Sequence, residues 1–217
     1  GYGQSSGYTS VETGTRSVTV TPTGATSPQV ISENLPLEEG EVYSIFAVDS
    51  LSAISAIFTA EDKSAVQGQA KIRFVHASPD APAVDIRTGS ATGSAVFSDA
   101  AFKDISDYIT VAPDDYMFVV TPAGVEDEVI AFNPVGLEAG QVYTVVAHGT
   151  LDDTDNVPFA VRVFIDNGAG DQFVDLTAAP TTSNLRVIHT SYDAPNVDVA
   201  LDRSEEHTSE LQSLLII

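Results

Sequence analysis

One segment of the chain occurs twice, and this repeat constrains the fold more than any other feature of the sequence. The first copy, residues 71–87, reads KIRFVHASPDAPAVDIR, and the second, residues 185–200, reads LRVIHTSYDAPNVDVA. Four positions keep a constant separation of 113 (189 − 76) between the copies: His76 and His189, Asp80 and Asp193, Pro82 and Pro195, Asp85 and Asp198. Because this separation is the size of a domain, the sequence predicts a tandem array.

The beginning of the chain also matches part of this repeat, at a different separation. Tyr8 corresponds to Tyr108, and LEEGEVY at residues 37–43 corresponds to LEAGQVY at residues 137–143, each at a separation of 100 (108 − 8). The sequence therefore predicts four segments: the C-terminal half of a repeat at 1–66, a complete repeat at 70–180, the opening strands of a further repeat at 184–202, and a separate tail at 203–217.

Short apolar segments separated by turn residues indicate the fold class. They are rich in Val, Ile, Phe and Tyr, recur about every ten residues, and lack the i, i+3, i+4 periodicity of helices. The strands expected in the complete repeat are residues 72–77, 84–87, 116–121, 128–132, 142–147 and 159–165. A repeat of roughly 100 residues with such strands is typical of an Ig-like sandwich. We expect an all-β chain of tandem Ig-like antiparallel β-sandwich domains.

The charge of the chain limits its partners. It has 31 acidic and 9 basic side chains, and its formal net charge is −22. Such a charge repels nucleic acids and anionic membrane surfaces, and no segment approaches the roughly 20 apolar residues that span a bilayer. We therefore expect neither nucleic-acid binding nor membrane insertion. Salt adaptation, a calcium-rich exterior and ordinary secretion all fit this acidity.

The first residue is Gly1, and no charged and apolar leader precedes it. Either a signal peptide was removed or the start of the sequence is missing. The absence of cysteine excludes a disulfide framework and leaves the redox compartment open.

The repeated HASPDAP segment predicts a turn, because proline cannot donate to a strand ladder and aspartate caps turns through its carboxylate. The structural turn residues are His76, Ser78, Asp80, Pro82 and Asp85 in the first copy, and His189, Asp193, Pro195 and Asp198 in the second. His, Ser and Asp also make up hydrolase triads. However, His76 and Ser78 lie two apart in one strand, and the chain has no G-x-S-x-G nucleophile turn. We expect no catalytic residues.

Two aspartate-rich loops are candidate calcium sites, because carboxylate oxygens are the hard ligands that calcium prefers. The loops read LDDTDN at residues 151–156 and DNGAGD at residues 166–171. Their candidate ligands are Asp152, Asp153, Asp155, Asp166 and Asp171. Neither loop has EF-hand spacing, and acidic loops arise easily in a chain of this composition. Solvated loops without an ion are therefore the alternative, and no other cofactor is expected.

Three motifs together resemble a known family. FVHASPDAPAVDI at residues 74–86, DYITVAP at 107–113 and LEAGQVYTVVAHGTL at 137–151 are similar to the domain-of-unknown-function family 4397 of bacteria and archaea. The resemblance covers nearly all of residues 1–202, and the third copy departs from it at Thr190 and Tyr192. It implies repeated β-sandwiches of an exported, cell-surface protein, and it carries no activity.

The tail differs in origin from the repeats. RSEEHTSELQS, residues 203–213, resembles the translation of a widely used DNA sequencing adapter and interrupts the third repeat. A terminal amphipathic helix is the competing interpretation, since Leu211, Leu214 and Leu215 fall at helical spacing. We assign no function to residues 203–217.

The expected function is that of a non-enzymatic extracellular structural or adhesive surface repeat, whose surface or matrix ligand is not indicated. One alternative is a filament subunit, in which residues 184–202 complete the half repeat 1–66 of another copy by head-to-tail strand exchange. A second alternative is the accessory region of a secreted hydrolase.

Overall fold

The structure is a computed structural model that describes residues 3–25, 27–152, 157–168, 172–181, 198–201 and 212–215. The chain divides into two compact units, Gly1–Ala179 and Pro180–Ile217. All the regular secondary structure assigned in the described residues is β-strand, which confirms the all-β prediction. No helix that could cross a bilayer occurs in this part of the chain.

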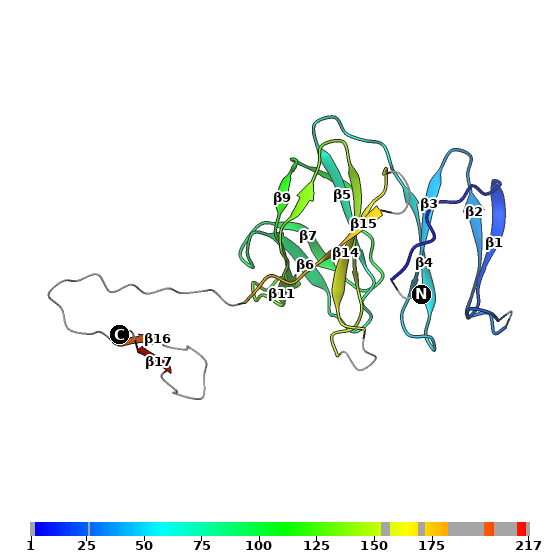
Figure 1. The fold of residues 1–217 in the computed structure, drawn as a ribbon. Coiled ribbons are helices and arrows are strands. Elements are labelled where there is room, and N and C mark those ends of the chain that lie inside the picture. Colours follow the sequence, from blue (N-terminus) through cyan, green and yellow to red (C-terminus); the bar gives the residue numbers. More distant parts are fainter. Residues whose placement is uncertain are drawn as a thin grey trace. The chain divides into compact units, whose positions relative to one another are not determined.

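Two hairpins begin the first unit (Figure 1). β1 (Gly14–Val20) pairs antiparallel with β2 (Ile31–Leu37), and β3 (Val42–Val48) pairs antiparallel with β4 (Ser55–Glu61). A TPTG sequence forms the corner between β1 and β2, where the amide of Ala25 donates to the carbonyl of Pro22 at 3.0 Å. Gly24 has a positive φ of 81° there, which explains the glycine at that position.

Two sheets form the sandwich that follows. The larger sheet has the strand order β15-β14-β13-β5-β8, and the smaller sheet has the order β11-β10-β6-β7. The larger sheet consists of β5 (Ala70–His76), β8 (Ile109–Val111), β13 (Val142–His148), β14 (Ala160–Ile165) and β15 (Gln172–Leu176). The smaller consists of β6 (Val84–Thr88), β7 (Ala95–Ala100), β10 (Phe118–Pro122) and β11 (Ile130–Ala131). β9 (Asp114–Tyr116) and β12 (Val135–Leu137) form a separate short ladder.

The core of the sandwich lies between these sheets. Ile72 and Phe74 of β5 belong to one buried cluster with Val145 of β13, Ile86 of β6 and Val120 of β10. Alternate side chains of a strand point to the same face, so each strand contributes every second residue to this cluster. This alternation places Ile72 and Phe74 on the core face of β5.

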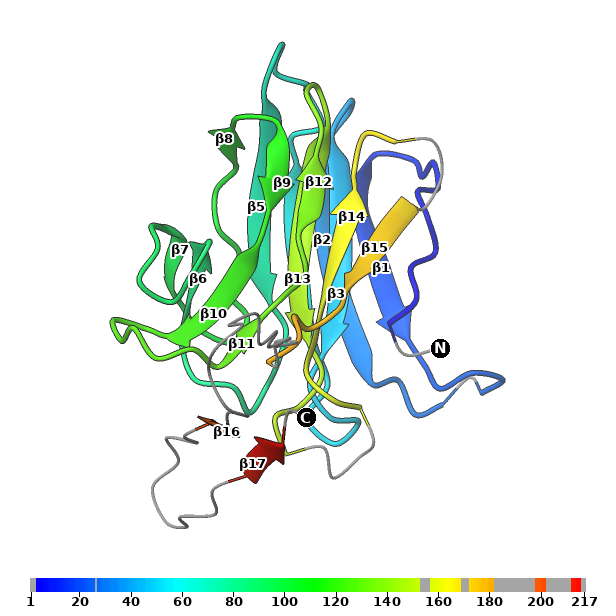
Figure 2. The same cartoon turned by 60° about the vertical axis from the view of Figure 1, so that its left-hand side comes forward.

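One ladder departs from the expected antiparallel pattern. β5 and β13 run side by side in parallel, with Ile72 opposite Tyr143 and Arg73 opposite Thr144 (Figure 2). A parallel pair requires a long crossover connection. Here the chain between β5 and β13 builds all four strands of the smaller sheet before it returns, so the sandwich is mixed rather than purely antiparallel.

In the second unit, β16 (Asp198–Leu201) pairs antiparallel with β17 (Gln212–Leu215). The predicted turn residue Asp198 thus begins a strand, whereas His189, Asp193 and Pro195 lie outside the described residues. Because Gln212–Leu215 is a strand, the helix considered for the tail does not form there.

Candidate functional site

All seven residues of β5 are buried, on both faces of the strand. In a sandwich whose sheet faces water on its outer side, alternate residues would be exposed. Ile72 and Phe74 point into the core, whereas Arg73 and Val75 lie on the outer face, where residues of β3 and β4 contact them. We name this contact, between hairpin β3–β4 and the outer face of β5, β13 and β14, the joint.

One end of the joint is apolar. Val48 of β3 and Ile57 of β4 form a buried cluster with Val75 of β5 and Val146 of β13. Phe46 and Phe164 pack against this cluster while remaining partly exposed. The apolar end therefore attaches the hairpin to the sandwich by removing apolar surface from water.

The other end of the joint is built around Arg73, whose residue surface is only 1% exposed. Its Nε donates to Thr144 Oγ1 at 2.9 Å, and one Nη donates to Glu61 Oε1 at 3.0 Å. The other Nη donates to the carbonyl of Ala60 at 3.2 Å. The guanidinium thus binds the sandwich through Thr144 and the hairpin through β4, with a partner for each of its three nitrogens.

Two equivalent polar clusters meet in the joint. In the first, the hydroxyls of Tyr8 and Ser44 donate to Glu61, with the Tyr8 bond at 2.5 Å. The second consists of Tyr108, Thr144 and Asp166: Tyr108 donates to Asp166 Oδ2 at 3.2 Å and Thr144 donates at 2.6 Å. Tyr108 and Thr144 lie 100 positions after Tyr8 and Ser44, the separation that relates the two registers of the sequence.

The two carboxylates occupy the same place in their hairpins. Glu61 pairs with Val42 in the β3–β4 ladder, and the amide of Asp166 donates to the carbonyl of Val142 at 2.8 Å. The joint therefore brings together two buried carboxylates, and Arg73 forms its ion pair with Glu61.

Burial sets the protonation of these groups. It raises the pKa of Asp166 to about 6, and the neighbouring Glu61 carboxylate adds to this rise, while Thr144 and Arg73 oppose it. Burial also raises the pKa values of Tyr8 and Tyr108, so both hydroxyls remain protonated and act as donors at neutral pH. Cations lie over both rings: Lys63 Nζ is 3.6 Å from the Tyr8 centroid, and Arg73 Cζ is 4.8 Å from that of Tyr108.

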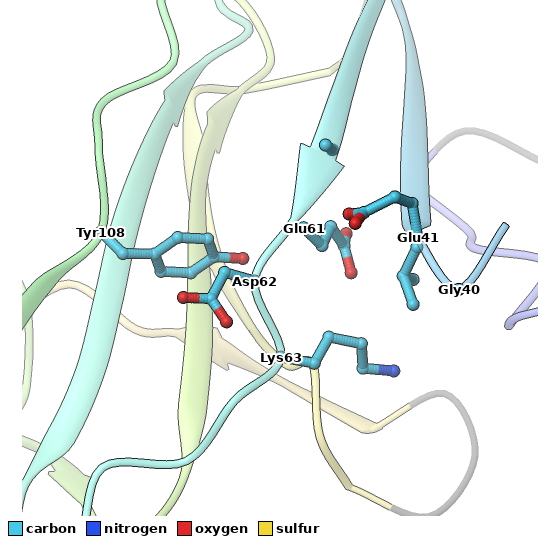
Figure 3. A pocket seen from close by; sticks show the side chains of 8 residues that line it. Gly40, Glu41, Glu61, Asp62, Lys63 and Tyr108 are labelled. Atoms are coloured by element: carbon cyan, nitrogen blue, oxygen red, sulfur yellow. The ribbon is translucent and has the colours of Figure 1, made fainter. Parts of the chain in front are cut away.

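A pocket of about 530 Å³ opens beside the polar end of the joint (Figure 3). Its lining includes Glu41, Glu61, Asp62, Lys63 and Tyr108, from the start of β3, the end of β4 and the segment before β8. Among the charged side chains of this lining three are acidic and one is basic. Within the described part of the chain, no three His, Asp or Glu side chains are grouped so that they could hold a metal ion.

The predicted turn residues lie together at the other end of β5. His76 is fully buried, its Nε2 lies 3.2 Å from the carbonyl of Pro82, and its Nδ1 accepts the amide of Ser78 at 3.4 Å. Burial lowers the pKa of His76, which favours the neutral ring. The hydroxyl of Ser78 donates to the carbonyl of Gly149 at 2.8 Å, so this hydroxyl ties the turn to the end of β13.

The two aspartates predicted for the turn accept backbone amides, Asp80 in the turn itself and Asp85 in strand β6. Asp80 is exposed and accepts the amides of Leu151 at 2.8 Å and Asp152 at 3.1 Å. Asp85 is buried, accepts the amide of Asp99 at 2.9 Å, and pairs with Arg87 at 3.0 Å. For both carboxyls desolvation alone would raise the pKa, but the hydrogen-bond donors outweigh it and hold the pKa below its usual value.

The candidate calcium ligands are placed only in part. Asp166 is buried in the joint, where two hydroxyls donate to it, and the amide of Asp152 donates to Asp80. Asp153, Asp155 and Asp171 lie outside the described residues. The calcium site therefore stays a prediction.

Sequence reasoning missed the joint, although two signals pointed to it. Arg73 lies between the apolar residues Ile72 and Phe74, and it recurs as Arg186 in the second copy of the segment. The equivalence of Glu61 and Asp166 was hidden because their spacing differs. Asp166 lies 24 residues after Val142 (166 − 142), whereas Glu61 lies 19 residues after Val42 (61 − 42).

The chain was also compared with known proteins. The family described as "Domain of unknown function (DUF4397)" matches residues 1–87 and 90–200. A search of curated proteins found none that matches the chain.

Proposed function

The chain belongs to the DUF4397 family, and on that premise we propose that it is a non-enzymatic structural or adhesive repeat of an extracellular surface protein. The observation that carries this proposal is the joint. Domains joined by a linker usually move against each other unless their interface is large and apolar. Here an apolar cluster and a buried ion pair hold hairpin β3–β4 against the sandwich. Such a contact suits a protein whose task is to keep consecutive repeats in a fixed arrangement.

The polar residues most suggestive of catalysis have structural partners, which supports a non-enzymatic function. The Ser78 hydroxyl donates to Gly149, away from His76, and His76 is bound to the Pro82 carbonyl and the Ser78 amide. A nucleophile needs its hydroxyl bonded to the base that activates it. This arrangement gives the hydrolase alternative no support.

An exterior location is consistent with the composition. A net charge of −22 keeps repeated domains soluble and apart, and it suits an environment rich in salt or divalent cations. Digestion of intact cells with a protease that cannot enter them tests this location. We expect loss of the protein from intact cells, and full protection of the protein would contradict it.

Nuclear relaxation tests the structural part of the proposal. In the native chain, backbone amides of β3–β4 and of β13–β14 should report one rotational correlation time, because the joint holds them together. Val48→Asp places a charge in the apolar end and should separate the two values, whereas Val125→Asp, at an exposed position, should leave them equal. Two correlation times in the native chain would contradict a rigid joint.

A further inference from the structure

Strands β3 and β13 correspond to each other at the separation of 100 residues, but their side chains differ in how far they are buried. Val145 of β13 is 3% exposed in the sandwich core, whereas Ile45, which lies 100 positions earlier on β3, is 42% exposed. β13 has β5 along one edge and β14 along the other. In the described residues, the sheet that contains β3 holds only β3 and β4. β3 therefore presents a free backbone edge beside a partly uncovered core-type face.

The pairing of β5 with β13 shows what kind of strand fits this edge. Ile72 lies opposite Tyr143, Arg73 opposite Thr144, and Phe74 opposite Val145, in a parallel register. The same register on β3 would place two apolar residues opposite Tyr43 and Ile45, with an arginine between them opposite Ser44. An added strand of this kind gains backbone hydrogen bonds from the edge and specificity from its alternate side chains.

The second copy of the β5 segment has that pattern; VRV at residues 161–163 has it too, but β14 is already paired on both edges, with β13 and β15. Residues 185–190 read LRVIHT, and Arg186 lies 113 positions after Arg73. We propose that β3 accepts residues 185–190 of a second copy of the chain as a parallel strand, with Leu185 opposite Tyr43, Arg186 opposite Ser44 and Val187 opposite Ile45.

The reach of the connecting chain favours a second copy over the same molecule. Ala179 is bonded to Ala131 of β11 at 2.8 Å, and β11 belongs to the smaller sheet. Stacked sheets lie about 10 Å apart, so the layer of β3, on the outer side of the larger sheet, is two spacings or about 20 Å away. The six steps from Ala179 to Leu185 span at most about 20–22 Å when fully extended. That length suffices only for a straight path through the larger sheet, and the way around it is longer.

The joint supplies a charged partner for the incoming strand. Arg73 bonds to the hydroxyl of the strand beside it, Thr144, and to the carboxylate of the other cluster, Glu61. By the equivalence of the two clusters, an arginine opposite Ser44 would bond to that hydroxyl and to Asp166. Asp166 is 4% exposed, and none of the ion pairs among the described residues includes it. A guanidinium from Arg186 would compensate this buried carboxylate.

This inference goes beyond the proposed function, because it concerns contacts between molecules. Its tests are independent of the test of the rigid joint, so either proposal can be wrong without the other. The donor and acceptor surfaces are different parts of the chain, so the contact is heterologous and adds molecules head to tail unless a ring closes.

Disulfide trapping tests the register, and the cysteine-free sequence makes it specific. A chain carrying Ile45→Cys is mixed with a chain carrying Val187→Cys under mild oxidation, and the products are separated without reductant. Facing residues of paired strands lie within disulfide range, so we expect a product of twice the chain mass. The matched control replaces Val187→Cys by Ile188→Cys, which points to the opposite face of the strand and should give little product. Each chain is also oxidised alone.

The outcomes separate the possibilities. A twofold-mass product that needs both chains supports the proposal. The proposal is overturned if no mixture yields it, or if Val187→Cys and Ile188→Cys react equally. A chain carrying both Ile45→Cys and Val187→Cys that forms only an internal disulfide would overturn the assignment to a second copy.

Sedimentation measures the contribution of the arginine. Arg186→Met should weaken self-association by at least about tenfold, since the added strand would then leave Asp166 without an ion-pair partner. Arg203→Met removes the same charge from the tail and should leave self-association unchanged. Equal effects of the two variants would contradict the pairing of Arg186 with Asp166.

Discussion

Arg73 is the residue on which the polar end of the joint depends most. It contacts the hairpin and the sandwich at once, and its ion pair with Glu61 is buried on both sides. A buried pair is not by itself stabilising relative to apolar residues, because both charges lose their hydration. Removing one partner is costly, however, because the other charge stays buried without compensation.

Arg73→Met should therefore lower the free energy of unfolding by about 3–5 kcal/mol. The double variant with Glu61→Leu should lose less than the single one, because no charge remains unpaired. Urea denaturation measures both. Arg16→Met removes the exposed pair with Glu12 and should change stability by less than about 1 kcal/mol. Equal stability of Arg73→Met and the native chain would show that the pair is not formed.

Asp166 gives the joint a dependence on pH. Its pKa is raised from 3.8 to about 6, so the folded chain holds this proton more tightly than the unfolded chain. The protonated carboxyl therefore stabilises the folded chain below about pH 4, and this stabilisation is lost as the pH rises through about 6. The effect is about 3 kcal/mol, the difference of 2.2 between the two pKa values multiplied by 1.36 kcal/mol.

Asp166→Asn keeps an oxygen that can accept hydrogen bonds from Thr144 and Tyr108 but cannot titrate. Free energies of unfolding measured between pH 4 and 7.5 should fall less with rising pH in the variant than in the native chain. Parallel curves for the two proteins would rule out Asp166 as the titrating group.

Strand β5 is the element that links the parts of the first unit. It pairs with β13 and β8 through its backbone, fills the core with one face, and forms the joint with the other. The turn after it continues this function, because Ser78 reaches Gly149 and Asp80 reaches Leu151. Asp85, at the start of β6, then binds the amides of Asp99 and Gly124.

Replacing the buried Asp85 tests the turn as a structural device. Asp85→Ala should lower the free energy of unfolding by about 3 kcal/mol, because two backbone amides and Arg87 lose their acceptor. Asp127→Ala, at an exposed position, serves as the control and should stay within about 0.5 kcal/mol. An Asp85→Ala chain with native stability would argue against a structural role.

The net charge of −22 affects the stability of the chain as a whole. Like charges repel one another across the folded surface, and the Debye length falls from about 30 Å at 0.01 M salt to about 3 Å at 1 M. Screening should therefore favour the compact state.

The melting temperature, measured in chelator at low salt, should rise when NaCl is added to molar concentration. Micromolar calcium supplies almost no screening, so a comparable rise with calcium alone would replace general screening by specific calcium loops. A melting temperature that depends on neither ion would contradict both explanations.

The strand pattern and the repeat register could be read from the sequence, because both are properties of residues close together in the chain or of exact recurrence. The apolar segment at residues 72–77 predicted the strand that the structure has as β5, and the match of Tyr8 to Tyr108 identified two residues whose hydroxyls make equivalent hydrogen bonds. Turn chemistry likewise predicted the reversal after His76.

The joint could not be read in this way. Nothing local shows that the outer face of β5 is covered, that Arg73 bonds to Glu61, or that β5 runs parallel to β13. These features depend on which surfaces meet when two hairpins and a sandwich pack together, and packing joins residues such as Tyr8, Arg73 and Asp166 that are far apart in sequence. A period of two specifies which side chains share a face, but what covers that face is decided by the burial of apolar and paired charged groups in three dimensions.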